Sequence, residues 1–221
     1  MRLRRGGASE CLAHGRLSTP PRLGDVMRPE SVRRSVLILG GASSGKSAFA
    51  QRLASSMGAR VLFVATAWPS DREMEQRIAR HQAERPPSWR LIERPASLHG
   101  VTEALGDTQV VLFDSLSLWL AGRLPEDATG DDQDEAFERF VRSQVEHLFG
   151  ACAGRCHLVV VSDEVGLGLV PPYPSGRRYR ELLGRLNQTA AAAASTVYLT
   201  VAGIPRALKG PDADAVAAGP L

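Results

Sequence analysis

The chain has 221 residues, of which 43% are hydrophobic and 23% are charged. This length fits one α/β domain of moderate size, and the composition is too apolar and too balanced for a disordered chain. No apolar run approaches 18 residues, which excludes a membrane span, and the N-terminal arginines precede no apolar signal segment. Three cysteines cannot build a disulfide framework, so we expect a cytoplasmic protein.

The net charge of +3 is unevenly distributed along the chain. Residues 1–34 hold eight arginines and three acidic residues, so their net charge is +5, and the remaining residues sum to −2. A basic excess confined to a tail does not indicate a nucleic-acid partner. From composition we expect a disordered basic extension over 1–32, a folded domain over 33–208 and a flexible tail over 209–221.

Short apolar runs alternate with helical patterns in the expected domain. The apolar runs predict strands at residues 36–39, 61–65, 110–113, 158–161 and 196–201, the last of these being the final strand. The helical patterns lie at residues 46–57, 71–85, 133–150 and 176–194. Continuous apolar strands that alternate with helices predict an α/β fold, with a mostly parallel sheet and helices on both faces.

The strongest motif is Gly40-Gly41-Ala42-Ser43-Ser44-Gly45-Lys46-Ser47, which matches the P-loop pattern G-x-x-x-x-G-K-[ST] between an expected strand and an expected helix. Its glycines let backbone N–H groups turn toward phosphate oxygens, and the helix adds its positive N-terminal end. Lys46 can reach the β- and γ-phosphates, and the Ser47 hydroxyl can bind Mg²⁺. The flanking strand and helix disfavour the alternative of a glycine-rich turn that matches by chance.

Acidic residues follow two of the expected strands. Asp114 directly follows the strand at 110–113, where a carboxylate can hold Mg²⁺ beside a P-loop. Asp163 and Glu164 follow the strand at 158–161. Because open α/β sheets bind ligands at the carboxyl ends of their strands, all three are candidate site residues. For Asp114, a role that is limited to capping the next turn stays open.

The expected helix at 71–85 carries Met74, Ile78 and His81 at the spacing i, i+4, i+7, which places them on one face. By this pattern alone, His81 is more readily a partly buried core histidine than a catalytic group. Arg85 lies one turn further on, where its guanidinium could meet the phosphate that the P-loop is expected to bind.

Several stretches together resemble the family of bifunctional adenosylcobinamide kinases and adenosylcobinamide-phosphate guanylyltransferases of cobalamin biosynthesis. They are LILGGASSGKSAFAQ (37–51), FVATA (63–67), DREMEQRIARHQAERPPSWRLIE (71–93), VVLFDSLSLWL (110–120), VVVSDEVGLGLVP (159–171) and RRYRELLGRLNQTAAAAASTVYLTVAGIP (177–205). The stretch R-I-x-x-H-x-x-x-R-P-x-x-W and the stretch S-D-E-V-G are the specific parts. The family usually has Asn at the position of Asp163, so the resemblance assigns that residue no role.

The resemblance implies a P-loop NTPase-like (RecA-like) sheet that supports two reactions. A kinase step moves the γ-phosphoryl group of ATP or GTP to the hydroxyl of adenosylcobinamide. A second step transfers GMP from GTP to the phosphate product, giving adenosylcobinamide-GDP and pyrophosphate. Family members carry the GMP on the histidine of the R-I-x-x-H stretch, which is His81 here, and a neutral imidazole can attack the α-phosphorus. Lys46 and Mg²⁺ would neutralise phosphate charge.

The resemblance also implies a homotrimer and a set of nucleotide contacts outside the P-loop. These contacts are Thr66, Ala67, Trp68, Gln82, Ala83, Glu84, Arg85, Glu93 and Asp114, with Ser47 and Asp114 as ligands of Mg²⁺. A carboxylate such as that of Glu93 could accept hydrogen bonds from guanine and favour GTP over ATP. Which carboxylate binds the base stays open.

Two other classes of function stay open. A P-loop small-molecule kinase without the guanylyl step would not need His81 in its particular surroundings. A regulatory GTPase usually carries an N-K-x-D motif that binds guanine, and this chain has none.

Overall fold

The computed structural model describes residues 32–69, 72–83, 85–125 and 131–210. The chain divides into two units, 1–32 and 33–221, and every element below belongs to the second. The expected N-terminal extension, apart from its last residue, and the tail beyond residue 210 lie outside the described residues.

A seven-stranded sheet with the order β3-β2-β4-β5-β1-β6-β7 forms the centre of the fold. The strands are β1 (Ser35–Gly40), β2 (Val61–Ala65), β3 (Arg90–Glu93), β4 (Val110–Asp114), β5 (His157–Asp163), β6 (Thr196–Val201) and β7 (Ile204–Lys209). All neighbouring strands pair in parallel except β6 and β7, which are antiparallel. The predicted mostly parallel sheet is therefore confirmed.

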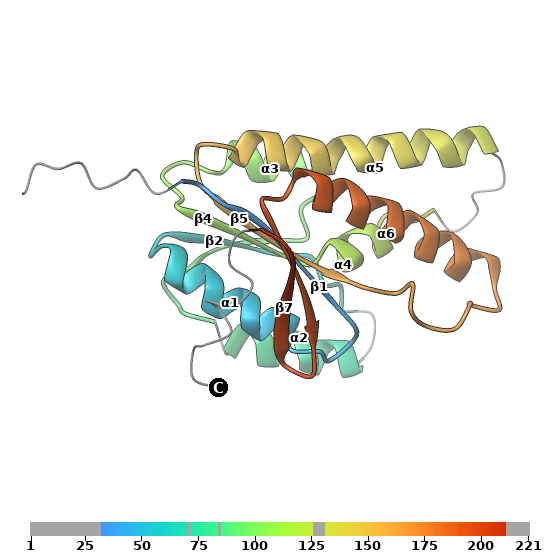
Figure 1. Cartoon of the computed structure of the whole chain (residues 1–221), viewed down its shortest axis with the longest axis horizontal. Helices are drawn as coiled ribbons and strands as arrows, with labels where there is room; N and C mark the ends of the chain where they lie inside the picture. Colours follow the sequence, from blue (N-terminus) through green and yellow to red (C-terminus); the bar gives the residue numbers. More distant parts are fainter. Residues whose placement is uncertain (1–31, 70–71, 84, 126–130, 211–221) are drawn as a thin grey trace, which may run out of the picture. The chain divides into compact units, whose positions relative to one another are not determined.

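Helices cover both faces of this sheet, as predicted. They are α1 (Lys46–Met57), α2 (Arg72–Ala83), α3 (Leu98–Glu103), α4 (Leu116–Ala121), α5 (Asp131–Cys152) and α6 (Pro174–Ala193). Figure 1 shows α1 and α2 on one face and the other four helices on the opposite face. Each face has its own apolar core, one including Phe49 and Leu112, the other Phe113, Trp119 and Leu183. Of the described helices, none is both long and apolar enough to cross a membrane.

The strand at 196–201 is not the last one, so that expectation is wrong. The chain turns at Ala202 and Gly203, whose φ angles are 51° and 81°, and returns as β7, which extends one residue into the expected tail. As an edge strand, β7 pairs on one side only and leaves several side chains exposed. It therefore lacks the continuous apolar run by which a buried strand is recognised. The short edge strand β3 escapes prediction for the same reason.

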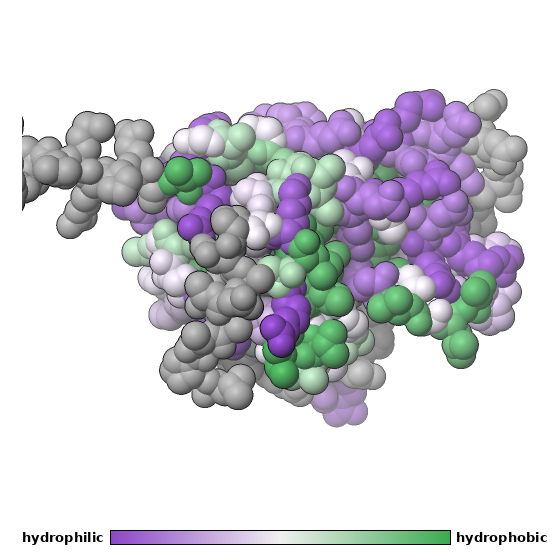
Figure 2. All heavy atoms as spheres, in the orientation of Figure 1, coloured by the Kyte–Doolittle hydropathy of each residue, from purple (hydrophilic) through white to green (hydrophobic). Residues whose placement is uncertain are grey.

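Apolar side chains are also exposed at two places, both visible in Figure 2 as green surface: the β6–β7 hairpin and the loop between β5 and α6. On the hairpin, Val201, Ile204 and Leu208 are more than half exposed. On the loop, Leu167 and Leu169 are almost fully exposed. Contiguous apolar surface of this kind is typical of contact sites rather than of bare surface.

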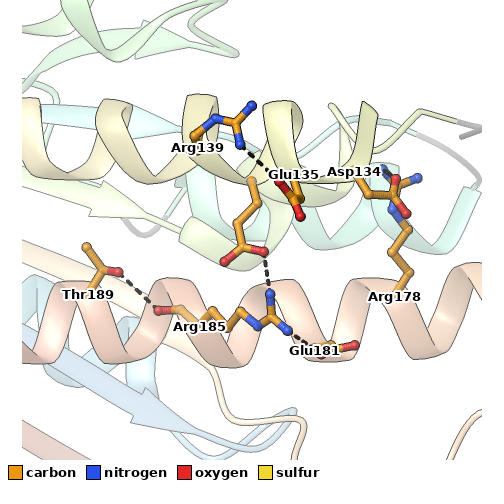
Figure 3. Close-up of polar contacts among 8 residues, drawn as sticks. Asp134, Glu135, Arg139, Arg178, Glu181, Arg185 and Thr189 are labelled. Carbon is orange, nitrogen blue, oxygen red and sulfur yellow. Dashed lines mark hydrogen bonds and ion pairs between the residues drawn. The ribbon is translucent and has the colours of Figure 1, made fainter. Parts of the chain in front are cut away.

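Helices α5 and α6 pack side by side and are joined by ion pairs (Figure 3). Arg185 of α6 pairs with Glu138 of α5 and, at 2.5 Å, with Glu181 of its own helix. Arg178 pairs with Asp134 in the same way across the two helices. The pair of Arg185 and Glu181 is exposed and contributes little to stability, whereas the Arg178 side chain is only 16% exposed. The apolar contacts beneath these pairs also hold α6 in place.

Leu183→Ala is expected to destabilise the protein by about 2–5 kcal/mol, because the Leu183 side chain is fully buried under α6 and its loss leaves a cavity. Leu169→Ala removes the same atoms from a side chain that is 97% exposed, and should change stability by less than about 0.5 kcal/mol. Denaturant unfolding of both variants measures the difference. Equal losses of stability would contradict the assigned packing of α6.

Candidate active site

The P-loop between β1 and α1 depends on two glycines. A Cβ on Gly40 would lie 2.4 Å from the carbonyl oxygen of Thr200. Gly45 has a φ angle of 91°, and a Cβ there would lie 3.0 Å from Cα of Gly203. Only glycine satisfies both demands without displacing the backbone. The loop ends at the first N–H groups of α1, whose positive helix end favours an anion.

Lys46 is buried in the first turn of α1, and its ammonium group already has two acceptors. Nζ donates to the carbonyl oxygen of Gly41 at 2.6 Å and lies 2.7 Å from Oδ1 of Asp163 at the end of β5. Nearby, Ser44 Oγ is buried and makes no hydrogen bond within the described part of the chain. A buried hydroxyl without a partner is costly, and a bound phosphate oxygen would provide the missing acceptor.

A cavity of about 520 Å³ lies at the carboxyl ends of β1, β2, β4 and β5. Near the P-loop its polar lining is Lys46, Ser47, Asp114, Asp163 and Glu164. The sheet thus gathers the P-loop and the predicted strand-end carboxylates at one edge, as expected for parallel strands. Further polar lining comes from α2, from the segment just after it and from the end of β3: Glu75, Gln82, Arg85, Glu93 and Arg94.

Arg85 lies between an aromatic ring and two carboxylates. Its guanidinium carbon is 3.8 Å from the ring centroid of Phe63. Burial lowers the pKa of Arg85, while the negative charges of Glu93 and Asp114 act in the opposite direction and help to keep the group protonated. Its Nε is buried and makes no hydrogen bond within the described residues. A fixed guanidinium with an unused donor is suited to a phosphate oxygen.

A chain of polar contacts crosses the carboxyl ends of the strands. Thr66 after β2 donates from Oγ1 to the carbonyl oxygen of Ser115 and accepts from its N–H, both at 2.7 Å. The hydroxyls of Ser115 and Ser117 are 2.8 Å apart, and Ser117 Oγ donates to Oδ2 of Asp163 at 2.5 Å. Since Thr66 is only 1% exposed, its visible role is to fix the backbone that follows Asp114.

The helix that carries His81 borders the cavity. Ile78 and Gln82, on either side of His81 in α2, both line it. The side chain of His81 and all of Glu84 lie outside the described residues, so the predictions for them stay predictions. Gln82 donates from Nε2 to Oε1 of Glu93 at 3.3 Å, so Glu93, one candidate for binding guanine, lies beside the predicted segment of α2.

The remaining predicted contacts divide into two groups. Ala67 lines the cavity, whereas Thr66, Trp68 and Ala83 are not part of its lining. Trp68 is about half exposed, and the guanidinium of Arg94 lies 5.2 Å from its ring centroid. Roles for Thr66, Trp68 and Ala83 in nucleotide binding therefore stay predictions.

The cavity also includes residues that the sequence did not single out. Phe63 and Leu118 belong to apolar stretches that the sequence marks only as core. Arg94 directly follows β3, where its N–H donates to the carbonyl oxygen of Ala65 at 2.7 Å. Had β3 been predicted, its position at a strand end would have identified Arg94, because the carboxyl ends of all parallel strands meet at this edge.

Comparison with known proteins gives concordant matches. The model of the family described as cobinamide kinase / cobinamide phosphate guanyltransferase (CobU) matches residues 36–208. The bifunctional adenosylcobalamin biosynthesis protein CobP of Pseudomonas aeruginosa is 40% identical over 179 residues, covering 79% of this chain and 96% of that protein. The corresponding CobU protein of Escherichia coli is 37% identical over 176 residues, covering 76% and 96%. Among solved structures, the RadB recombinase aligns over 81% of this chain and 82% of its own, with 14% identity and a TM-score of 0.44.

Proposed function

The chain belongs to the family of cobinamide kinases / cobinamide phosphate guanyltransferases, and from this we infer that it performs both reactions at the cavity over the P-loop. It phosphorylates adenosylcobinamide and then transfers GMP from GTP to the phosphate product, in cobalamin biosynthesis. The observation that carries this function is the family match over 36–208, which includes the P-loop, α2 and every strand-end carboxylate of the cavity. The match favours this function over that of a kinase without the guanylyl step.

In the kinase step, the protein's part is to position the triphosphate and to offset its charge. The N–H groups at the start of α1 and the ammonium of Lys46 would face the phosphates, and Arg85 offers a further cation in the lining of the same cavity. The substrate hydroxyl oxygen forms a bond to the γ-phosphorus while the bond from that phosphorus to the β–γ bridging oxygen breaks. The bridging oxygen leaves with the nucleoside diphosphate, and the hydroxyl proton passes to water.

A magnesium ion fits the side chains at the P-loop end of the cavity. Ser47 and Asp114 both line it there, and hydroxyl and carboxylate oxygens are the ligands that Mg²⁺ prefers. When bound, the ion would supply positive charge against the phosphate oxygens.

In the guanylyl step, we assign His81 as the nucleophile. Its imidazole nitrogen would form a bond to the α-phosphorus of GTP while the bond to pyrophosphate breaks, and the phosphate of the cobinamide substrate would then displace the histidine. The support from this structure is the position of His81 in α2, between two residues that line the cavity. Glu93, at the same wall, can accept from the N1 and N2 hydrogens of guanine once Gln82 releases it.

A homotrimer is proposed from the family resemblance. The exposed apolar side chains of the β6–β7 hairpin, Val201, Ile204 and Leu208, support an interface of some kind on that edge. Light scattering distinguishes a trimer from a monomer.

A cytoplasmic location remains a proposal from the cysteine content, and the two described cysteines, Cys152 and Cys156, are free thiols.

Labelled GTP separates the two proposed reactions. With Mg²⁺, GTP labelled at the α-phosphate should leave an acid-labile, base-stable label on the protein, which then passes to cobinamide phosphate. GTP or ATP labelled at the γ-phosphate should label cobinamide and not the protein. Transfer of the γ-label with no α-label on protein or product would identify a plain kinase.

A further inference from the structure

The contacts of Lys46 place its ammonium group where a triphosphate would bind. Nζ donates to the carbonyl oxygen of Gly41, inside the P-loop itself, and its ion pair with Asp163 is 2.7 Å long. The lysine thus folds back over the loop whose N–H groups would hold phosphate. The side chain of Lys46 is 8% exposed and that of Asp163 is 33% exposed, so the ion pair is partly buried and is screened less than a pair on the surface.

Asp163 is fixed in position independently of Lys46. The parallel register of β1 and β5 sets it opposite Gly40, the first residue of the P-loop. Its Oδ2 accepts from Ser117 Oγ at 2.5 Å, and its backbone carbonyl oxygen accepts from Nδ2 of Asn187 at 3.0 Å. Behind these contacts, the hydroxyl of Tyr179 donates to the carbonyl oxygen of Ser117 at 3.1 Å.

The Tyr179 hydroxyl keeps its proton and therefore remains a hydrogen-bond donor to Ser117. Its burial and, to a smaller extent, the negative charge of Asp163 raise the pKa of the Tyr179 hydroxyl above its ordinary value, so the phenol keeps its proton at neutral pH. Strand β5 and Asn187 of α6 hold the backbone at Asp163, and Ser117 of α4 holds its carboxylate, so the carboxylate has a position that does not depend on Lys46.

We propose that Asp163 is a positioning residue that competes with the triphosphate for Lys46. The inference rests on the proposed binding of nucleotide at the P-loop. To meet the β- and γ-phosphates, the ammonium group must give up its contact inside the loop and weaken its pair with Asp163. The fixed carboxylate also repels the incoming phosphates, so the ion pair lowers nucleotide affinity and recaptures Lys46 when product leaves.

Two other roles for Asp163 fit the contacts less well. A general base for the substrate hydroxyl fits less well, because one oxygen of Asp163 already faces the ammonium of Lys46 and the other already accepts from Ser117. A residue that prepares Lys46 for catalysis would hold Nζ outside the loop, whereas here Nζ bonds to a loop carbonyl. Competition accounts for both observations.

Asp163→Asn tests the inference, because it removes the charge and keeps a side chain of the same shape. The matched control is Glu164→Gln. Glu164 is the next residue and lines the same cavity, but its carboxylate accepts from the N–H groups of Gly166 and Leu167 at 2.9 and 3.0 Å. Calorimetry with GTP and Mg²⁺ measures Kd, guanosine serves as the ligand without phosphates, and kinase assays give KM and kcat.

For Asp163→Asn, we expect the Kd of GTP to fall about tenfold, which corresponds to about 1.4 kcal/mol. The KM of the nucleotide should fall in parallel while kcat changes by less than about threefold, because a released Lys46 improves ground-state binding. Guanosine should bind unchanged. Glu164→Gln removes a negative charge from the same cavity without touching Lys46, so it should tighten GTP binding by less than Asp163→Asn does. Ser117→Ala removes the donor to Oδ2 of Asp163, so the carboxylate should hold Lys46 more strongly and the Kd of GTP should rise about two- to threefold.

Three results would overturn the inference. An unchanged or weaker affinity in a folded Asp163→Asn variant would mean that Asp163 supports Lys46. An equal gain in Glu164→Gln would mean that only the total charge of the cavity matters. If Asp163→Asn does not fold, then unchanged or tighter GTP binding by Ser117→Ala decides against competition. Failure of the unaltered protein to bind GTP would instead refute the proposed function, and with it the premise.

Discussion

Lys46→Ala is expected to lower kcat/KM of both reactions by about 10²–10³ or more. A loss of this size is typical when a preorganised charge contact to a reacting group is removed. The substitution deletes the one cation held inside the P-loop and leaves the carboxylate of Asp163 facing the phosphates without its 2.7 Å partner. The loss should therefore combine missing attraction with added repulsion. Turnover of each reaction and calorimetric binding of GTP measure the effect.

The double variant Lys46→Ala with Asp163→Asn separates these two contributions. If repulsion matters, the second substitution should restore part of the GTP affinity that Lys46→Ala loses, and the two effects will not be additive. Thermal unfolding of both variants checks that the P-loop still folds. Near-normal nucleotide binding and turnover in Lys46→Ala would place the nucleotide site elsewhere.

His81→Ala is expected to abolish guanylyl transfer, by roughly four orders of magnitude or more, since a covalent carrier has no substitute. The same variant should retain substantial kinase activity, because phosphoryl transfer needs positioning and charge neutralisation but no covalent protein intermediate. Labelling with α-labelled GTP should disappear. Kinase turnover, transferase turnover and label incorporation are the three measurements.

His81→Asn controls for packing in this experiment, since it keeps bulk and polarity without the nucleophilic imidazole. It should behave as His81→Ala does. His99→Asn, on α3 at the opposite face of the sheet from α2, should leave the label in place. Loss of both reactions in a folded His81→Asn protein would assign His81 a role in the shared nucleotide site. Retained guanylyl transfer would exclude the covalent role and favour the interpretation of His81 as a core histidine.

The local sequence predicts those parts of the site that depend on neighbouring residues. The P-loop is one continuous segment whose glycines, lysine and serine are recognisable without any partner. Asp114 ends β4, whose other four residues are apolar and buried because the strand is covered on both faces. The apolar spacing of Met74 and Ile78 predicts the helix that carries His81, whereas a role at the nucleotide site came only from the family resemblance.

Edge elements are where the sequence pattern fails. Strands β3 and β7 pair on one side only and are partly exposed, so their residues carry neither a continuous apolar run nor a helical period. The helices α3 and α4 have six residues each, too few to establish a period. Without β3, the place of Arg94 in the cavity could not be predicted.

What the sequence by itself determined is the α/β class, the P-loop, the edge of the sheet that holds the site and, through the family motifs, the two reactions. What only the tertiary structure decided is which distant side chains meet there. The 2.7 Å pair of Lys46 and Asp163 joins residues 117 positions apart, and Arg85 reaches the ring of Phe63 from beyond α2. Such contacts arise from the order and register of β1, β5, β4 and β2. Because packing across the whole sheet sets that order and register, they cannot be predicted from a local stretch of sequence.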